Sequence, residues 1–237
     1  MRRKQMSHNN KNNTVVMFSG GVDSLIAWLF LDKPKCVHIN LHVPYAQKEL
    51  ETVKYFSQKF NMNCEIVDIA SINSQPLSPT LEDPFIPSRN LLLAIIGSWF
   101  GERVCVAGVK GDLVEDKSPQ AYEKMSELLT KFSRKKIEVF SPFWEMTKGD
   151  IIEWYVKSGE EIEALHRTVG CYHPALHQCG ECGCCFRKWT AFKVNNIQPL
   201  FEVCNEIRNK YRERALSNYY DEQRNREILK ALGENYD

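Results

Sequence analysis

The sequence predicts an α/β fold: a doubly wound parallel sheet with helices on both faces, then a small C-terminal cysteine knuckle and further helices. Two observations support this. Short apolar runs alternate with helical patterns up to Gly159, and repeated β–α units favour a parallel sheet. Five of the nine cysteines then crowd between Cys171 and Cys185. We therefore expect a disordered basic lead-in over 1–13, an α/β domain over 14–165, and the knuckle with C-terminal helices over 166–237.

The first half of the chain supplies three expected strands and three helices. Apolar strand formers predict strands at 14–18, 35–41 and 65–69, and helical spacing predicts helices at 25–31, 49–60 and 89–99. Asp23 and Ser24 fit the capping positions of the first helix. The third helix is nearly all apolar, so we expect it to be buried. The stretch 71–84 is rich in Ser, Pro and Asn and is expected to be a loop.

The second half follows the same rules until Gly159. Strands are expected at 103–107 and 137–141, and helices at 121–132 and 148–157, with Thr147 as a cap. Beyond the knuckle, 202–216 and 221–232 look like charged amphipathic helices. Ligands in such sheets bind beyond the carboxyl ends of the strands, so the unusual loops should gather at that edge.

The chain is organised around Ser19-Gly20-Gly21-Val22-Asp23-Ser24, which lies between the first strand and the first helix. Glycines can adopt positive φ, and successive N–H groups at a helix start attract anions. The pattern predicts a phosphate cradle. It is neither a Walker A loop nor Gly-x-Gly-x-x-Gly. It resembles the PP-loop of ATP pyrophosphatases, which split ATP between the α- and β-phosphates.

Composition narrows the class of protein. The net charge of +1 gives no strong nucleic-acid signal, and no apolar run is long enough to span a membrane. Without a signal-peptide pattern, clustered cysteines favour a metal site in a cytoplasmic protein over disulfides. Cys36, Cys64 and Cys105 are expected to be small buried side chains, and Cys204 lies in a helical pattern.

The knuckle has the spacing Cys-x7-Cys-x2-Cys-x2-Cys. Cys-x2-Cys spacing lets two thiolates reach one ion, and Gly180 and Gly183 permit tight turns. Four thiolates suit a closed, structural Zn²⁺ site. An iron–sulfur cluster is a rival interpretation, and His173 and His177 are conceivable ligands. The expected zinc ligands are Cys171, Cys179, Cys182 and Cys185, which leaves Cys184 outside the set.

Together, the glycine turn and the knuckle resemble the 7-cyano-7-deazaguanine synthase (QueC/ExsB) family. Intermediate segments agree in order, namely Pro44-Tyr45-Ala46-Gln47, Pro87-Ser88-Arg89-Asn90, Ser141-Pro142-Phe143 with Thr147-Lys148, and Thr168-Val169-Gly170-Cys171-Tyr172. The resemblance implies an adenine nucleotide alpha hydrolase-like, Rossmann-like fold for the PP-loop domain. The segment 108–120 departs from the family pattern, because Asp116 and Ser118 remain but the family's Asp-Cys-Arg is missing. The family's Arg after the last cysteine is Lys188 here, with Arg187 beside it.

The resemblance implies ATP, Mg²⁺ and zinc as cofactors, and a small-molecule carboxylate and ammonia as reactants. Family members adenylate 7-carboxy-7-deazaguanine, form an amide with ammonia, and dehydrate it to the nitrile through a second adenylation. Queuosine biosynthesis is the implied pathway. The residues expected to bind the nucleotide are Phe18, Ser19, Gly20, Gly21, Val22, Asp23, Ser24, Arg89 and Gly108. Those expected to be catalytic are Asp23, Ser24, Arg89, Lys148 and Asp116.

Each role has a plainer alternative. Arg89 and Lys148 would neutralise charge on the departing pyrophosphate, and Asp116 would recognise the base or position ammonia. Arg89 could instead pair near a helix start, Lys148 could be a solvated first-turn lysine, and Asp116 a loop carboxylate. Asp23 would orient Mg²⁺ or the glycine turn.

Three other functions stay open at this point. The enzyme could transfer an activated deazapurine or other carboxylate to an amine other than ammonia. It could be a tRNA-modifying PP-loop enzyme, or a non-catalytic zinc-knuckle binding module. Aromatic residues in the C-terminal helices could support a homodimer or pack on their own sheet, and the charged ends leave room for a protein partner.

Overall fold

The computed structural model describes residues 13–69, 85–175 and 177–234. Nearly all of the expected lead-in and the whole loop 71–84 lie outside the described residues. Within the described part of the chain, five parallel strands form one sheet in the order β3-β2-β1-β4-β5. They are β1 (Thr14–Met17), β2 (Lys35–Asn40), β3 (Cys64–Asp68), β4 (Arg103–Cys105) and β5 (Glu138–Phe140). Val15 lies in register with Lys35 on one side and Val104 on the other.

This strand order confirms the doubly wound topology. The chain moves outward from β1 to β3, returns past β1 to β4, and ends at β5. The order therefore reverses between β1 and β4, which is where such sheets open a crevice for a ligand at their carboxyl ends. The Ser-Gly-Gly turn follows β1 directly and lies at this switch point.

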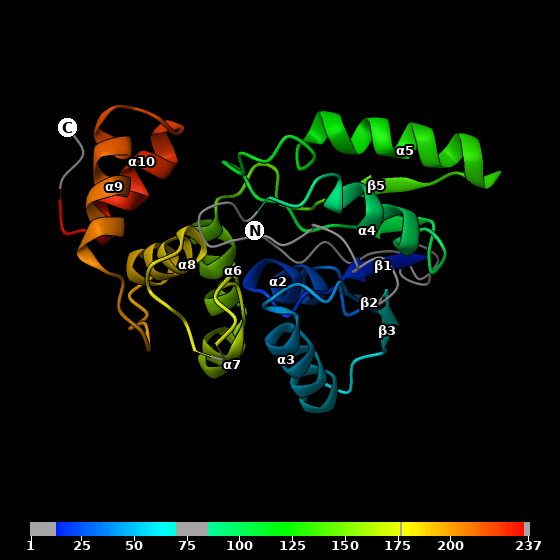
Figure 1. Cartoon of the computed structure of the whole chain (residues 1–237), viewed down its shortest axis with the longest axis horizontal. Helices are drawn as coiled ribbons and strands as arrows, with labels where there is room; N and C mark the ends of the chain where they lie inside the picture. Colours follow the sequence, from blue (N-terminus) through cyan, green and yellow to red (C-terminus); the bar gives the residue numbers. More distant parts are fainter. Residues whose placement is uncertain (1–12, 70–84, 176, 235–237) are drawn as a thin grey trace.

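Helices cover both faces of the sheet (Figure 1). On one face lie α2 (Val22–Phe30), α3 (Ala46–Lys59) and α6 (Lys148–Lys157), and on the other lie α4 (Arg89–Gly97) and α5 (Pro119–Ser133). Successive strand residues point to opposite faces. Accordingly, Val16 packs in the core beneath α2, while Val15 and Met17 pack in the core with α4 and α5.

The C-terminal part contains two helices that the sequence pattern did not predict. They are α7 (Ile162–Arg167) and α8 (Gly183–Val194), and they precede the expected α9 (Asn205–Leu216) and α10 (Glu222–Ala231). Helix α8 contributes Phe192 to the main core and Phe186 and Trp189 to a second core with α9 and α10. The division of the chain at 165/166 remains a prediction, and α8 belongs to both cores.

The helix ends confirm some expectations and correct one. Thr147 and Asp150 form the reciprocal capping box that begins α6, and Gly159, at φ +78°, follows its end. Asp23 and Ser24 do not cap α2. The N-cap is Gly21, and the Ser24 hydroxyl donates to the Gly21 carbonyl oxygen at 3.1 Å from inside the first turn.

Two expected burial patterns and one expected helix position are also corrected. Helix α4 is buried only along the side that faces the sheet, on which Asn90, Ala94 and Gly97 recur at helical spacing, while Trp99 beyond its end is 70% exposed. Cys64 is partly exposed because β3 is an edge strand. Cys204 is the N-cap of α9 rather than a residue within the helix.

Candidate functional site

A cavity of about 230 Å³ lies at the carboxyl ends of β1 and β2. Its wall combines the glycine turn, the start of α4, the first turn of α6, the chain at 169–172 and the first turns of α8. Among the expected nucleotide and catalytic residues, its lining includes Phe18, Ser19, Gly21, Val22, Asp23, Ser24, Arg89 and Lys148. Residues more than 100 positions apart in sequence thus meet at the edge where the fold class places a ligand.

The glycine turn has the backbone geometry that its sequence predicts. Gly20 has φ +74°, and a Cβ atom there would lie 2.9 Å from Cγ2 of Thr52. The Ser19 hydroxyl accepts from the Gly21 N–H at 3.3 Å, and the Gly20 carbonyl accepts from Val169 N–H at 3.0 Å. The turn is therefore tied to the segment before the knuckle, and it precedes a nine-residue helix whose N-terminus favours anions.

Asp23 and Lys148 form an ion pair across the cavity wall. Asp23 stands in the first turn of α2 and Lys148 is the first residue of α6. The two helices pack against each other, which brings together side chains 125 positions apart. Lys148 is therefore a partly buried, paired cation beside the glycine turn rather than a solvated lysine.

Arg89 lies in an aromatic and acidic corner of the cavity. Its Nη1 donates to the Tyr45 hydroxyl at 3.5 Å, and the Tyr45 ring packs 5.4 Å from that of Tyr172. Burial disfavours charge on Arg89, but Tyr45, Tyr172 and Glu49 more than offset it, so the guanidinium pKa rises. Burial also raises the pKa of Glu49 to about 7, against the opposing effect of Arg89. Arg89 therefore stays charged, while Glu49 titrates near neutrality.

Three expected residues, Gly20, Gly108 and Asp116, are not among the residues that line the cavity. Both carboxylate oxygens of Asp116 accept from Asn90, at 2.7 Å from its side chain and 3.0 Å from its backbone N–H. Asp116 thereby caps α4, whose N-cap Ser88 makes no side-chain cap. Gly108 is bonded through its N–H and carbonyl to the Ser141 hydroxyl and would meet the Trp144 ring if it carried a Cβ.

The cavity also has cations that sequence reasoning did not assign to it. Lys117 and Arg187 both line it and both bind Asp112, which is only 2% exposed. Lys188 donates to the Thr168 carbonyl at 2.6 Å, and burial lowers its pKa to about 7. Arg187 and Lys188 lie at or beside the position at which the family has an arginine, and this was the sequence signal that could have placed them in the cavity. Nothing local in the sequence marked Lys117.

The four predicted zinc ligands come together at the start of α8. The sulfurs of Cys171, Cys179, Cys182 and Cys185 all lie within 4.8 Å of one another. Four sulfurs around zinc at about 2.3 Å are separated by about 3.8 Å, and the Sγ atoms of Cys179 and Cys185 are 3.9 Å apart. Cys171 Sγ accepts two backbone N–H bonds at 3.4 Å, and Cys182 Sγ accepts one from Cys185 N–H. The donor set fits one zinc ion.

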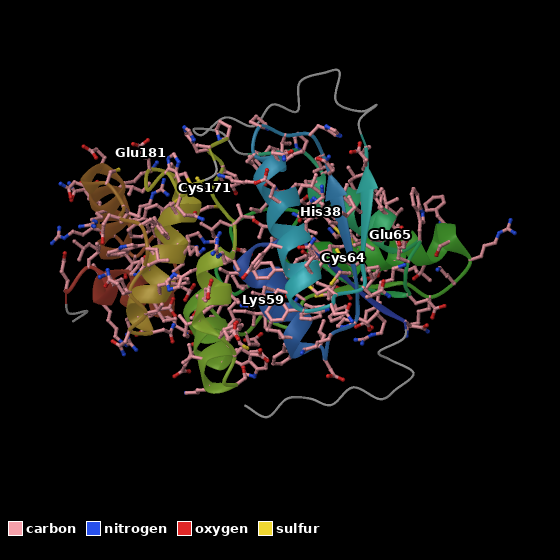
Figure 2. The ribbon with its side chains drawn as sticks, turned by 90° about the horizontal axis from the view of Figure 1, so that it is seen from below. His38, Lys59, Cys64, Glu65, Cys171 and Glu181 are labelled. Carbon is pink, nitrogen blue, oxygen red and sulfur yellow. The ribbon has the colours of Figure 1, made fainter. Side chains whose placement is uncertain are left out.

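The knuckle adjoins the cavity. Figure 2 places Cys171 between Glu181, on the outer side of the knuckle, and His38 of β2. Cys171 and Cys184 are both cavity-lining residues, whereas the Cys184 sulfur is outside the four-cysteine cluster. His38 also lines the cavity. Burial lowers its pKa, and its Nδ1 lies 3.0 Å from the Phe18 carbonyl oxygen.

The sheet order, the glycine turn at the switch point and the four-cysteine cluster define a PP-loop α/β protein with a Rossmann-like fold and a C-terminal knuckle. The comparison with known families gives the particular family. The family model described as queuosine biosynthesis protein QueC matches residues 13–196, so the chain belongs to the QueC family.

Relatives from three organisms agree with this assignment. A 7-cyano-7-deazaguanine synthase 1 from Colwellia psychrerythraea is 26% identical over 77% of this chain and 94% of its own length. A 7-cyano-7-deazaguanine synthase from Pseudoalteromonas translucida is 27% identical over 79% of this chain and 97% of its own length. A Sulfolobus acidocaldarius synthase is 25% identical over 83% of this chain, but the chain spans only about half of its length, 49%. None of the described helices is long and apolar enough to cross a membrane.

Proposed function

We propose that this protein uses ATP to adenylate a carboxylated 7-deazaguanine and, with ammonia, converts it to 7-cyano-7-deazaguanine. The observation that carries the proposal is a single cavity in which the Ser-Gly-Gly turn, Lys148 and Arg89 meet. Such a wall suits a triphosphate, because it offers backbone N–H groups at a helix start together with two cations. The names of the family and of its relatives supply the substrate class.

The proposed chemistry solves a leaving-group problem. A carboxylate resists attack by ammonia because oxide would have to depart. Attack of its oxygen on the α-phosphate breaks the α–β bond, releases pyrophosphate and gives an acyl adenylate. Ammonia then displaces AMP and leaves an amide. Adenylation of the amide oxygen by a second ATP releases another pyrophosphate, and loss of AMP and two protons gives the nitrile.

The residues divide the work by position. The N–H groups of Gly20, Gly21 and Val22, with the Ser19 and Ser24 hydroxyls, would hold the phosphate oxygens and the departing pyrophosphate. Lys148 and Arg89 would neutralise the charge that grows on pyrophosphate. Asp23 already holds Lys148 in place, and it also offers a carboxylate for a Mg²⁺ ion bound with the nucleotide.

The four-cysteine cluster would hold zinc in a structural role. Four thiolates complete a tetrahedron, which leaves no position at which a substrate could bind the metal. The ion would then fix the chain between Cys171 and Cys185, and with it the start of α8. Asp116, as the cap of α4, would support Arg89 and Asn90 from outside the cavity.

The decisive experiment is a product assay. Purified protein is incubated with 7-carboxy-7-deazaguanine, ATP, Mg²⁺ and ammonium, and pyrophosphate and products are measured by mass spectrometry. Two pyrophosphates per nitrile support the proposal. An amide or another conjugate as end product would show that adenylation is right but dehydration is not. Absence of any carboxylate-dependent pyrophosphate would contradict the proposed function.

Replacing Asp23 tests the phosphate site by itself. We expect Asp23→Ala to lose carboxylate-dependent ATP/pyrophosphate exchange by about 100-fold or more, because Lys148 is released from its place beside the turn. Zinc content should be unchanged. Glu163→Ala removes an exposed first-turn acid from α7 and serves as the control. Exchange at wild-type rate in Asp23→Ala would remove Asp23 from the site.

A further inference from the structure

Asp112, Lys117 and Arg187 form a charge cluster beside the cavity. Asp112 and Lys117 lie in the segment 108–120, and Arg187 lies on α8, 75 positions further along. The Asp112 carboxylate accepts from Lys117 Nζ at 2.8 Å and from Arg187 Nη2, one oxygen for each. This cluster joins the segment that departs from the family pattern to the helix that carries two of the cysteines.

Asp112 is buried behind the cavity wall, whereas Lys117 and Arg187 reach the cavity, and this difference indicates their separate roles. Asp112 is 2% exposed and is not a lining residue, whereas Lys117 and Arg187 both line the cavity. Burial by itself would raise the Asp112 pKa, but Lys117 and Arg187 override it and hold the pKa far below its usual range. Asp112 is therefore a fixed negative charge behind the wall, and the two cations are presented in front of it.

The charges do not cancel. One carboxylate faces two cations, so the cluster keeps a net positive charge at the cavity wall. An ammonium has three N–H donors and a guanidinium has five, and only one of each is used by Asp112 in the contacts described. The cluster thus offers several unassigned donors and an uncompensated charge, which together suit an anion with two oxygen atoms.

The two cations of this cluster have different partners from the cations already assigned to the nucleotide, although Lys148 and Asp23 lie near enough to act electrostatically on Asp112 and Arg187. Lys148 is paired with Asp23 beside the glycine turn, and Arg89 is bound to Tyr45 at the start of α4. The reacting carboxylate must approach the α-phosphate closely although both groups are negative. A second set of cations, supplied from other elements, would offset this repulsion.

We propose that Lys117 and Arg187, both positioned by Asp112, bind the carboxylate of the organic substrate before it is adenylated. The proposal rests on the proposed function and names the residues that select its acid substrate. It also gives a role to the segment 108–120, because Lys117 of that segment would contact the carboxylate of the substrate. Adenylation removes the carboxylate's charge, so these cations favour the acid over neutral acyl products.

The test compares three variants in steady-state assays of pyrophosphate release. We expect Lys117→Met to raise the KM for the carboxylate by about 10- to 100-fold, the loss of one charge-assisted contact, while the KM for ATP changes less than about twofold. Asp112→Asn should show the same split, because it releases both cations without removing either. Lys110→Met is the matched control, since Lys110 lies on the same segment but bonds to Gln223 and does not line this cavity.

Equal KM values for the carboxylate in wild type and Lys117→Met, or an equal rise in both KM values, would overturn the proposal.

Titration calorimetry without ATP separates this proposal from the proposed function. Wild-type protein should bind 7-carboxy-7-deazaguanine more tightly than the neutral 7-cyano compound, and Lys117→Met should lose that preference. If this preference exists but no pyrophosphate forms, the reaction is wrong and the carboxylate site stands. If wild type and variant bind the acid equally, the site is wrong. Zinc content and thermal unfolding check folding, and Lys117→Met decides alone if Asp112→Asn does not fold.

Discussion

At the scale of single residues, Gly180 illustrates how tightly the knuckle is built. It has φ +74°, its carbonyl accepts from Cys204 N–H at 3.0 Å, and a Cβ atom added to it would lie 2.2 Å from the carbonyl oxygen of Glu202. Backbone atoms cannot move aside as a flexible side chain can. The position therefore needs glycine for two reasons, its left-handed backbone conformation and the lack of space.

Gly180→Ala should lower the free energy of unfolding by about 2–4 kcal/mol, because conformational strain and the backbone clash add. Gly159→Ala is the matched control. Gly159 has φ +78° but no atom within 4 Å of an added Cβ, so it reports strain alone and should cost about 1 kcal/mol. Denaturant unfolding of both variants measures the difference. Equal losses would show that the clash at Gly180 relaxes without cost.

The site residues that sequence reasoning found share a local signature. The residue types of Ser19, Gly20 and Gly21, between a strand and a helix, predict the glycine turn. The spacing of the cysteines predicts the metal site. Lys117 has no such signature, and the only signal for Arg187 is its place beside the family's arginine position. Asp112 joins the two in the fold, and its contact with Arg187 links segments 75 positions apart, which no short stretch of sequence contains. Asp116 was placed in the site by motif, yet its contacts make it a helix cap.

At the scale of helices and strands, errors arose where two patterns overlap. Helix α8 begins at Gly183, inside the cysteine knuckle, and Cys182 is its N-cap, with its sulfur accepting from Cys185 N–H. Cysteine and glycine are weak helix formers, so metal-ligand spacing hid the start of the helix. The prediction that helix α4 is buried was wrong for a different reason. After Arg89 and Asn90 its residues are apolar on every side of the helix, but only the side that faces the sheet is buried.

The contact between Glu227 of α10 and Thr147, the N-cap of α6, should make the free energy of unfolding depend on pH. Thr147 donates to Glu227, and burial raises the pKa of Glu227 from 4.5 to about 7. The folded state therefore binds this proton more tightly than the unfolded state. Its contribution to stability is complete below pH 4.5 and is lost as the pH rises through about 7.

Glu227→Gln keeps an acceptor for Thr147 but cannot ionise. Relative to wild type, the variant should gain about 2–3 kcal/mol in unfolding free energy between pH 4.5 and pH 8. Urea unfolding of both proteins at several pH values measures this gain. A difference that does not change with pH would mean that Glu227 keeps its ordinary pKa in the folded protein.

At the scale of the whole molecule, the sequence predicted the doubly wound sheet, because alternating strands and helices constrain topology strongly. It did not predict how the C-terminal part attaches. That part has its own core, built from residues such as Trp189, Ile207 and Ile228, and it is joined to the main core through α8 (Figure 1). Such an attachment depends on packing between distant segments rather than on periodicity.

Purified protein should contain about one zinc per chain, and Cys182→Ser should lose it and destabilise the C-terminal core. Cys184→Ser is the matched control, because Cys184 neighbours the ligands but is outside their cluster, so zinc should be retained. Metal analysis and thermal unfolding provide the two measurements. Bound iron with visible absorption, or zinc retained in Cys182→Ser, would contradict the assigned ligands.

Helix α8 has a consequence for how the protein would respond to its surroundings. Within one turn it carries a proposed zinc ligand, Cys185, and two basic residues that line the cavity, Arg187 and Lys188. A rise of about 1.5 Å per residue separates Cys185 from Lys188 by only about 4.5 Å along the axis. If the knuckle holds zinc, loss of the ion would therefore displace these basic residues before any global unfolding. Turnover should fall in step with metal starvation, so that supply of the metal sets the working fraction of the enzyme.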